Sequence, residues 1–200
     1  MTFVAHSLAS GEIVRYLMRH GSDRVARVAL VAPAAIPFLL KTDDNPIRVP
    51  EAVFAQARNV FLSDFAGWAA ENAEPFFVPG TSQAMIDWTI RMMTQTSLQA
   101  AGELNRIMVA TDFRPELKQV DVPVLIIHGD RDASAPLDLT GCPAATLIRG
   151  SRLVVYEGAP HGLSFTRKER LNKDLINFIR SPRGGWLMNS AQARASQWFS

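Results

Sequence analysis

The sequence of 200 residues lacks the features that mark several large classes of protein. It contains one cysteine, Cys142, so a framework of internal disulfides is excluded. Basic and acidic residues nearly balance, at 21 and 19, which gives no electrostatic basis for binding nucleic acid or an anionic membrane. No apolar run reaches the roughly 18–20 residues that span a bilayer, and the N-terminus lacks the basic segment and cleavage site of a secretory signal. We therefore expect a cytoplasmic protein with neither membrane nor nucleic acid as partner.

The sequence gives equally little support for metal or thiol chemistry. The four histidines do not cluster with acidic residues at ligand spacing, so we expect no metal site. Cys142 stands between Gly141 and Pro143 with no base beside it, which favours an incidental thiol over a nucleophile. The chain is 48% hydrophobic and long enough to bury a substantial core in one domain.

The first 33 residues follow a strand–helix–strand pattern. Residues 2–5 form a short apolar run typical of the end of a buried strand, and from Gly11 apolar residues recur at helical spacing until His20 and Gly21. Residues 25–33 then predict a second buried strand that Pro33 terminates. This order predicts a βαβ unit, and hence a parallel sheet.

Three further segments follow from the spacing of apolar residues and prolines. Residues 34–115 predict a proline-rich loop and then an all-helical cap of three or four helices over 51–110. Residues 116–180 return to the α/β pattern, with strands at 122–128 and 153–156 and an amphipathic helix at 171–179. Residues 181–200 hold two of the four tryptophans but have no place in this scheme.

Ser7 lies where the first strand turns sharply into the first helix, which would push its side chain out above the sheet edge. The residues two before and two after such a serine must be small, because the backbone approaches itself closely there. Ala5 and Ala9 meet this requirement, although glycine is usual at both positions. Ser7 is thus a candidate nucleophile, and the N–H of Leu8 at the start of the helix is a candidate oxyanion donor.

Asp132 and His161 complete a candidate catalytic triad. Asp132 follows the strand at 122–128 by four residues, and His161 follows the strand at 153–156 by five. In a parallel sheet both loops lie at the edge where Ser7 is presented. The three residue types suit the roles of nucleophile, general base and imidazole-orienting acid.

Other residues near these motifs have alternative interpretations. Asp130 competes with Asp132 for the acidic role and could instead fix the turn; we favour Asp132. His6 is expected to be a packed structural residue, with its side chain pointing away from Ser7. His128 is expected to be buried and hydrogen-bonded, and His20 to end a helix. Glu12 suits the first turn of that helix better than a catalytic role.

The chain resembles the α/β-hydrolase superfamily, and within it the cofactor-free bacterial haloperoxidase (non-haem chloroperoxidase)/arylesterase group. The order serine, acid, histidine is the order of that superfamily. The resemblance extends from residue 2 to about 180. It rests on these motifs: His6-Ser7, 11–16, 19–21, 39–43, Asn45-Pro46, 111–113, Val122-Pro123, 128–132 and 158–163.

The resemblance implies a triad of Ser7, Asp132 and His161 and a substrate pocket formed by the helical cap. It also implies that earlier strands, and a loop that donates a second oxyanion N–H, precede the elbow. We therefore expect an N-terminally truncated chain: the C-terminal half of an α/β-hydrolase fold, with about four parallel strands, flanking helices and an α-helical cap. The family has glycines where this chain has Ala5, Ala9 and Ser10, and residues 181–200 match nothing in its pattern.

The function expected from these features is hydrolysis of small carboxylic esters through an acyl-enzyme. In the resembling group peroxide can replace water, which implies perhydrolase or haloperoxidase side activity. The alternatives are a truncated, catalytically silent chain and a small-molecule-binding module. The first strand would be an exposed apolar sheet edge, which favours self-association.

Overall fold

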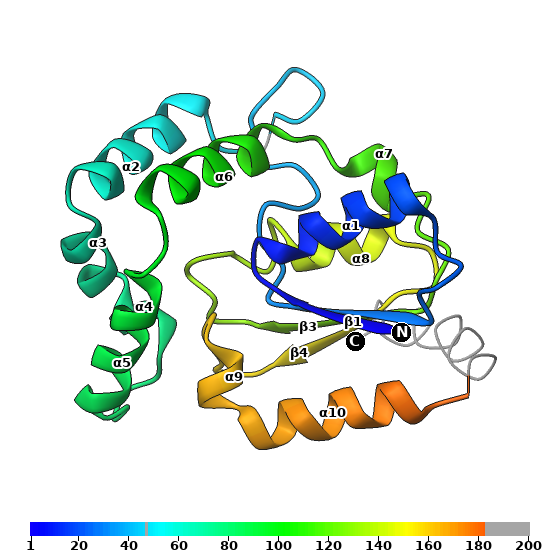
Figure 1. Cartoon of the computed structure of the whole chain (residues 1–200). Coiled ribbons are helices and arrows are strands. Elements are labelled where there is room, and N and C mark those ends of the chain that lie inside the picture. The colour runs from blue at the N-terminus through cyan, green and yellow to red at the C-terminus, as the bar shows by residue number, and fades with distance from the viewer. Residues whose placement is uncertain (47, 183–200) are drawn as a thin grey trace, which may run out of the picture.

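Four parallel strands form the centre of the molecule, in the order β1-β2-β3-β4 (Figure 1). The computed structural model describes residues 1–46 and 48–182. The strands are β1 (Thr2–His6), β2 (Arg27–Val31), β3 (Val124–Gly129) and β4 (Arg152–Tyr156). Because every neighbouring pair is parallel, all four carboxyl ends lie at one edge of the sheet. The predicted α/β class with about four parallel strands is confirmed.

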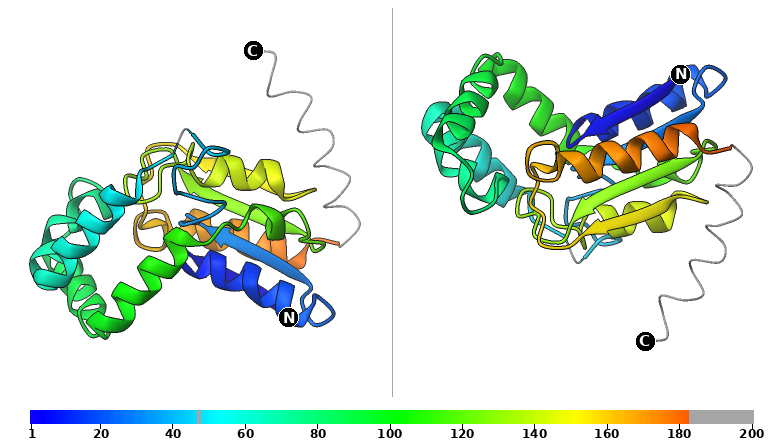
Figure 2. Two further views of the ribbon diagram at one scale, coloured as in Figure 1. Left: turned by 90° about the horizontal axis from the view of Figure 1, so that it is seen from above. Right: turned by 90° about the horizontal axis from the view of Figure 1, so that it is seen from below.

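Helices cover both faces of this sheet, as Figures 1 and 2 show. One face carries α1 (Ala9–His20), α7 (Arg114–Leu117) and α8 (Gly141–Leu147); the other carries α9 (Leu163–Thr166) and α10 (Lys168–Arg180). Each face of the sheet has its own hydrophobic core. Val14 and Leu17 of α1 are buried in the core on the first face, and Leu171 and Phe178 of α10 are buried in the core on the second. β2 and β3 are buried along their whole length, which explains their continuous apolar runs.

Arg27 is the exception in the otherwise apolar β2. Its side chain is buried, lies 5.8 Å from the centre of the Phe178 ring, and donates to the backbone carbonyls of Ile179 and Ser181. These carbonyls belong to the C-terminal end of α10, where a cation and its N–H groups are favourable. The C-terminal end of α10 therefore stabilises the charge of Arg27 inside a buried strand.

β1 lies at the edge of the described sheet and is only partly buried. It pairs with β2 alone among the described strands, and only Ala5 of its five residues is buried. Val4 is 51% exposed because its side chain points to the face where α10 packs over the other strands. The strand expected at residues 2–5 is thus present as a partly exposed edge strand. Self-association through this edge stays a prediction.

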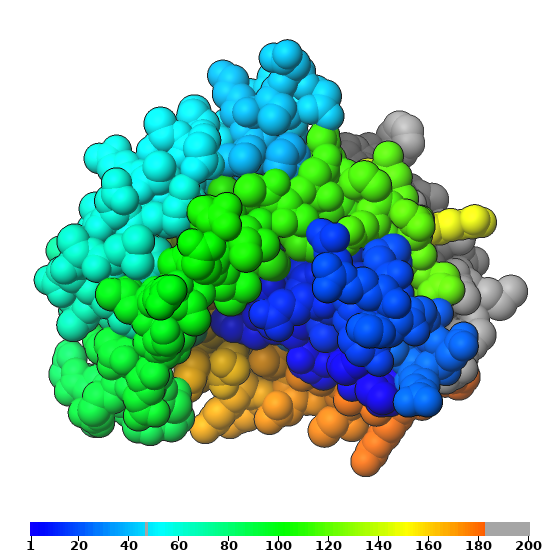
Figure 3. All heavy atoms as spheres, turned by 45° about the horizontal axis from the view of Figure 1, so that its top comes forward, coloured from blue at the N-terminus to red at the C-terminus, as the bar shows by residue number. Residues whose placement is uncertain are grey.

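The cap consists of five helices, where the sequence predicted three or four. They are α2 (Glu51–Ser63), α3 (Phe65–Glu71), α4 (Ala73–Phe76), α5 (Gln83–Met93) and α6 (Leu98–Ala110). Side chains divide the run further than its prolines suggest, because Asp64 and Ser97 accept hydrogen bonds from the N–H groups of Gly67 and Ala100 and so begin new helices. The cap lies beyond the carboxyl ends of the strands and forms a lobe beside the α/β core (Figures 2 and 3).

No helix within residues 1–46 and 48–182 is long and apolar enough to cross a membrane. Of the tail predicted at residues 181–200, the part from residue 183 onward lies outside the described residues. The division of the chain at residues 33, 115 and 180 stays a prediction.

Candidate active site

Ser7 occupies a tight turn between β1 and α1. Its φ is +58°, in the left-handed region that a residue with a side chain rarely adopts. The turn is held from both sides: the Ser7 N–H donates to the Val31 carbonyl at 3.1 Å, and the Ser7 carbonyl accepts from Ala34 at 3.2 Å and from Ser10 at 3.1 Å. The end of β2 and the start of α1 thus maintain a conformation that Ser7 would not favour alone.

The structure brings the three predicted side chains together. The Ser7 Oγ lies 2.9 Å from Nε2 of His161, and Nδ1 of His161 lies 2.7 Å from Oδ2 of Asp132. The carboxylate can only accept, so Nδ1 carries the ring proton and Nε2 is free to accept from the serine hydroxyl. Asp132 and His161 are each 5% exposed, so this arrangement is largely shielded from water.

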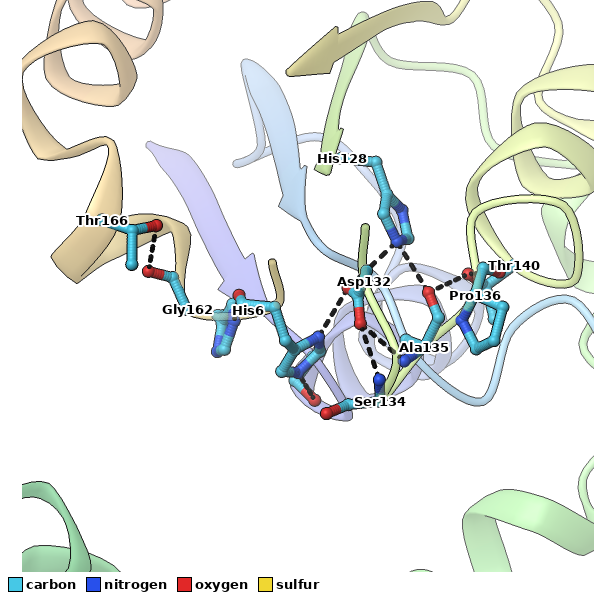
Figure 4. A network of polar contacts seen from close by, with 11 residues as sticks. His6, His128, Asp132, Ser134, Ala135, Pro136, Thr140, Gly162 and Thr166 are labelled. Carbon is cyan, nitrogen blue, oxygen red and sulfur yellow. Dashed lines mark hydrogen bonds and ion pairs between the residues drawn. The ribbon is translucent and has the colours of Figure 1, made fainter. Parts of the chain in front are cut away.

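Asp132 is held by hydrogen bonds on both of its oxygens, as Figure 4 shows. Oδ1 accepts from the backbone N–H groups of Ser134 at 3.0 Å and Ala135 at 2.7 Å. Oδ2 faces both His161 and His128, whose Nε2 is 3.2 Å away. Burial alone would raise the pKa of this carboxyl, but the donors from His128, His161 and Ala135 outweigh it and hold the pKa well below its usual range.

Asp130, the alternative acid, fixes the turn instead. Its Oδ1 accepts from the N–H of Gly158 at 2.7 Å, which joins the loop after β3 to the loop after β4. The N–H of Arg131 also donates to the carbonyl of Ala159 at 3.1 Å. The two loops that carry Asp132 and His161 are therefore tied together near the sheet edge, while Asp130 lies outside the triad geometry.

His6 lies closer to the site than the sequence suggested. Its Nε2 donates to the backbone carbonyl of His161 at 3.1 Å, and the two rings are 4.7 Å apart. Burial, followed by the charge of the nearby His161 ring, lowers the pKa of His6. His6 is thus packed and hydrogen-bonded, but against the residue that contacts Ser7. His20 is the exposed last residue of α1, and Glu12 is exposed in its first turn.

Aromatic side chains surround the other side of His161. The Phe76 ring, at the end of α4, is 5.7 Å from the His161 ring, and it also contacts Phe77 and Phe165. Trp88 of α5 lies 6.1 Å from Phe165 and is 46% exposed. The cap and α9 together therefore provide an apolar, aromatic wall next to His161. A hollow of about 480 Å³ elsewhere on the surface is lined by α1 and α6 and contains no triad residue.

The Leu8 N–H, the predicted oxyanion donor, lies between Ser7 and α1. It has no acceptor among the described residues. A donor at the positive end of a helix suits a developing negative charge beside Ser7.

The sequence also predicted no metal site and no nucleophilic role for the Cys142 thiol. Residues 1–46 and 48–182 contain no group of three or more metal-ligating side chains that could hold an ion. Cys142 is partly buried in α8, and burial together with the nearby Asp138 raises the pKa of its thiol.

Sequence analysis missed two contacts that position the triad. One is the approach of His128 to Asp132; the spacing of four residues across a strand end and a turn gives no periodicity that would reveal it. The other is the hydrogen bond from the Gly162 N–H to the Phe76 carbonyl, which links residues 86 positions apart. The glycine after His161 was a signal of close approach, but its partner could not be read from the sequence.

A parallel α/β sheet whose carboxyl edge brings together serine, histidine and aspartate, in that geometry, defines a protein of the α/β hydrolase type. Comparison with known families agrees. The chain belongs to the α/β hydrolase fold family, which it matches over residues 1–168.

Individual relatives narrow the group. The non-heme chloroperoxidase CPO-A1 of Kitasatospora aureofaciens is 36% identical, covering 90% of this chain and 67% of the relative. The bifunctional esterase/perhydrolase DCH of Acinetobacter calcoaceticus is 33% identical, covering 89% and 66%. The crystal structure of a bromoperoxidase from Bacillus anthracis superposes with a TM-score of 0.83 at 28% identity, covering 90% and 67%. The chain thus spans about two thirds of the length of these relatives. The predicted haloperoxidase group is confirmed.

Proposed function

We propose that this chain is a serine hydrolase that cleaves small carboxylic esters through an acyl-enzyme on Ser7. The observation that carries the proposal is the continuous set of contacts from the Ser7 Oγ to His161 at 2.9 Å and from His161 to Asp132 at 2.7 Å. A serine hydroxyl needs a base within this distance to become a useful nucleophile. The three groups meet this requirement in one buried arrangement.

In the first half of the reaction, the Ser7 Oγ bonds to the ester carbonyl carbon while its proton passes to Nε2 of His161. The carbonyl electrons move onto oxygen, next to the Leu8 N–H. Collapse of this intermediate breaks the bond to the alcohol, which leaves with the proton from His161. Asp132 stays ionised and stabilises the charged His161 ring throughout. The low pKa of the Asp132 carboxyl supports this role.

In the second half, water gives a proton to His161 and its oxygen bonds to the acyl carbon. Ser7 then leaves, regains the proton, and the carboxylic acid is released. Hydrogen peroxide in place of water yields a peracid, which can oxidise a halide while it is itself reduced to the acid. The names of the chloroperoxidase and esterase/perhydrolase relatives support this side activity.

The aromatic wall next to His161 supports an apolar substrate. The rings of Phe76 and Phe165 give the bound ester an apolar surface beside the reacting carbonyl. Leu8 is the single oxyanion donor that we assign. Loss of one such donor costs about 10²–10³ in rate in a model hydrolase. A silent chain and a pure ligand-binding module are the outcomes against which the proposal is tested.

The test compares three versions of the chain with p-nitrophenyl acetate and with a fluorophosphonate probe. We expect the native chain to release nitrophenol and to be labelled on Ser7, as located by peptide mass spectrometry, and Ser7→Ala to do neither. Ser10→Ala is the matched control, since Ser10 is a buried serine of the same segment whose Oγ has no partner among the described residues. Labelling or turnover that persists in Ser7→Ala rejects the assignment. Ester binding without labelling of the native chain favours the binding module.

A further inference from the structure

His128 contacts Asp132 at the same carboxylate oxygen that faces His161. It is the next-to-last residue of the buried strand β3, is 0% exposed, and has no part in the reaction steps proposed above. Its Nε2 lies 3.2 Å from Oδ2 of Asp132 and 2.8 Å from the carbonyl oxygen of Ala135 (Figure 4). The chain of contacts that begins at Ser7 therefore extends beyond Asp132 to a second histidine.

The partners of His128 determine where its proton lies. The Asp132 carboxylate and the Ala135 carbonyl are both acceptors, so Nε2 must be the protonated nitrogen. Nδ1 has no hydrogen-bond partner among the described residues. The backbone of Gly141 packs beside it, and a Cβ on that glycine would come within 2.5 Å of Nδ1. The ring is thereby held in one orientation, with a single N–H directed at Asp132 and Ala135.

We propose that His128 is a positioning residue for the triad, which fixes the Asp132 carboxylate and takes part of its charge. This inference rests on the proposed hydrolase function. Ala135 links the two ends of the carboxylate, because its N–H donates to Oδ1 at 2.7 Å while its carbonyl accepts from His128. With this ring of contacts closed, neither oxygen of Asp132 can rotate away from His161.

The shared charge has a consequence for the reaction. Oδ2 accepts from His128 and from His161 at the same time. When the His128 donor is removed, the carboxylate interacts more strongly with the protonated His161 ring. Activity should then be lost at a higher pH on the acidic side, because His161 holds its second proton more readily and is less available to accept the proton of Ser7. If His128 only filled space, its replacement would change stability but would not move the acidic limb of the pH–activity profile, where activity is lost as the pH falls.

The experiment compares His128→Leu, which removes the donor, with His128→Gln, whose amide nitrogen can reach the position of Nε2. We expect His128→Leu to lose about tenfold in kcat with little change in KM, because a hydrogen bond to a charged group is lost. Its acidic limb should move to higher pH, whereas His128→Gln should retain both the rate and the limb. His20→Leu, an exposed histidine at the end of α1, is the matched control and should behave as the native chain.

A second readout does not depend on activity. Nitrogen NMR of the 15N-histidine-labelled native chain should show His128 protonated at Nε2 and not at Nδ1, and the Nδ1–H signal of His161 should shift in His128→Leu. A native chain with His128 protonated at Nδ1, or an unmoved acidic limb in a folded His128→Leu, overturns the inference. If the native chain and Ser7→Ala are equally inactive, the proposed function fails, and the NMR result alone decides whether His128 positions Asp132.

Discussion

The backbone N–H of Gly162 donates a hydrogen bond of 3.0 Å to the carbonyl oxygen of Phe76, and so joins the cap to the residue that follows His161. A Cβ at position 162 would lie 2.5 Å from that carbonyl oxygen and 2.6 Å from the Phe76 ring. The conflict is with backbone, which cannot move without displacing the end of α4. A glycine is therefore required where the cap meets the loop of His161.

We expect Gly162→Ala to separate the cap from the His161 loop. Relieving a 2.5 Å approach shifts the backbone of one segment by a substantial fraction of an ångström, and misplacements near 1 Å cost up to about 10²-fold in rate. The esterase kcat/KM should fall by about 10- to 100-fold. Steady-state kinetics with p-nitrophenyl acetate provides the measurement.

Phe76→Leu is the control for this change, because it alters the ring and keeps the carbonyl. It should affect KM for apolar esters more than kcat, since the ring lies beside the proposed substrate site. A Gly162→Ala variant with native kinetics would show that the cap and the His161 loop are not coupled through this contact.

The strained backbone at Ser7 predicts that the chain loses stability by having a side chain there, although the proposed activity requires one. At φ +58° a Cβ is unfavourable, and glycine adopts this conformation freely. We expect Ser7→Gly to be more stable than Ser7→Ala by roughly 0.5–1 kcal/mol in the free energy of unfolding, although both lack esterase activity. Urea denaturation of the two variants tests this. Equal stability would mean that neighbouring contacts, not the backbone of residue 7, determine the turn.

Local patterns were sufficient to predict the sheet and the close approach of Ser7, Asp132 and His161. In a parallel sheet the loops after all the strands share one edge, so Asp132, which follows β3, and His161, which follows β4, could be placed near Ser7 from the sequence. The number of cap helices was wrong because Asp64 and Ser97, as helix caps, divide a run in which only prolines had been counted as breaks.

Contacts between distant segments were not predictable in this way. The exposure of Val4 depends on how far α10 extends across the sheet, which no feature of residues 2–5 reports. The environment of His6 depends on the loop of His161, 155 residues away. Alternation along a strand predicts that the side chain of His6 points away from Ser7, but it cannot say what lies on the other face.

The edge strand β1 provides a test of self-association. An unpaired, partly apolar edge can pair with the same strand of a second copy about a twofold axis. If it does, Val4→Lys should reduce association, because it places like charges on both strands near that axis and Lys is a residue that protects natural edges. Light scattering after size-exclusion chromatography, over a range of concentrations, measures the mass. Val4→Thr, which keeps the branched side chain without charge, is the control, and a native chain that stays monomeric throughout rules out this prediction.

His6 predicts a pH dependence of stability separate from that of catalysis. Burial, and then the charge of His161, lowers the pKa of His6 below its ordinary value of 6.5 in the folded chain. The unfolded chain therefore binds a proton more readily, so folding stability decreases as the pH falls below about 6.5. The loss is complete once the pH is below the folded-state pKa. The Asp132 carboxyl, with its own lowered pKa, acts in the same direction at lower pH, below about 4.

His6→Gln separates the two contributions, because it keeps an N–H that can donate to the His161 carbonyl but does not titrate. The free energy of unfolding, from urea titrations between pH 8 and pH 5, should fall less steeply in this variant than in the native chain. His20→Gln removes an exposed histidine and should leave the slope unchanged. Parallel curves for the native chain and His6→Gln would mean that His6 is protonated equally in the folded and unfolded states, contrary to its burial against His161.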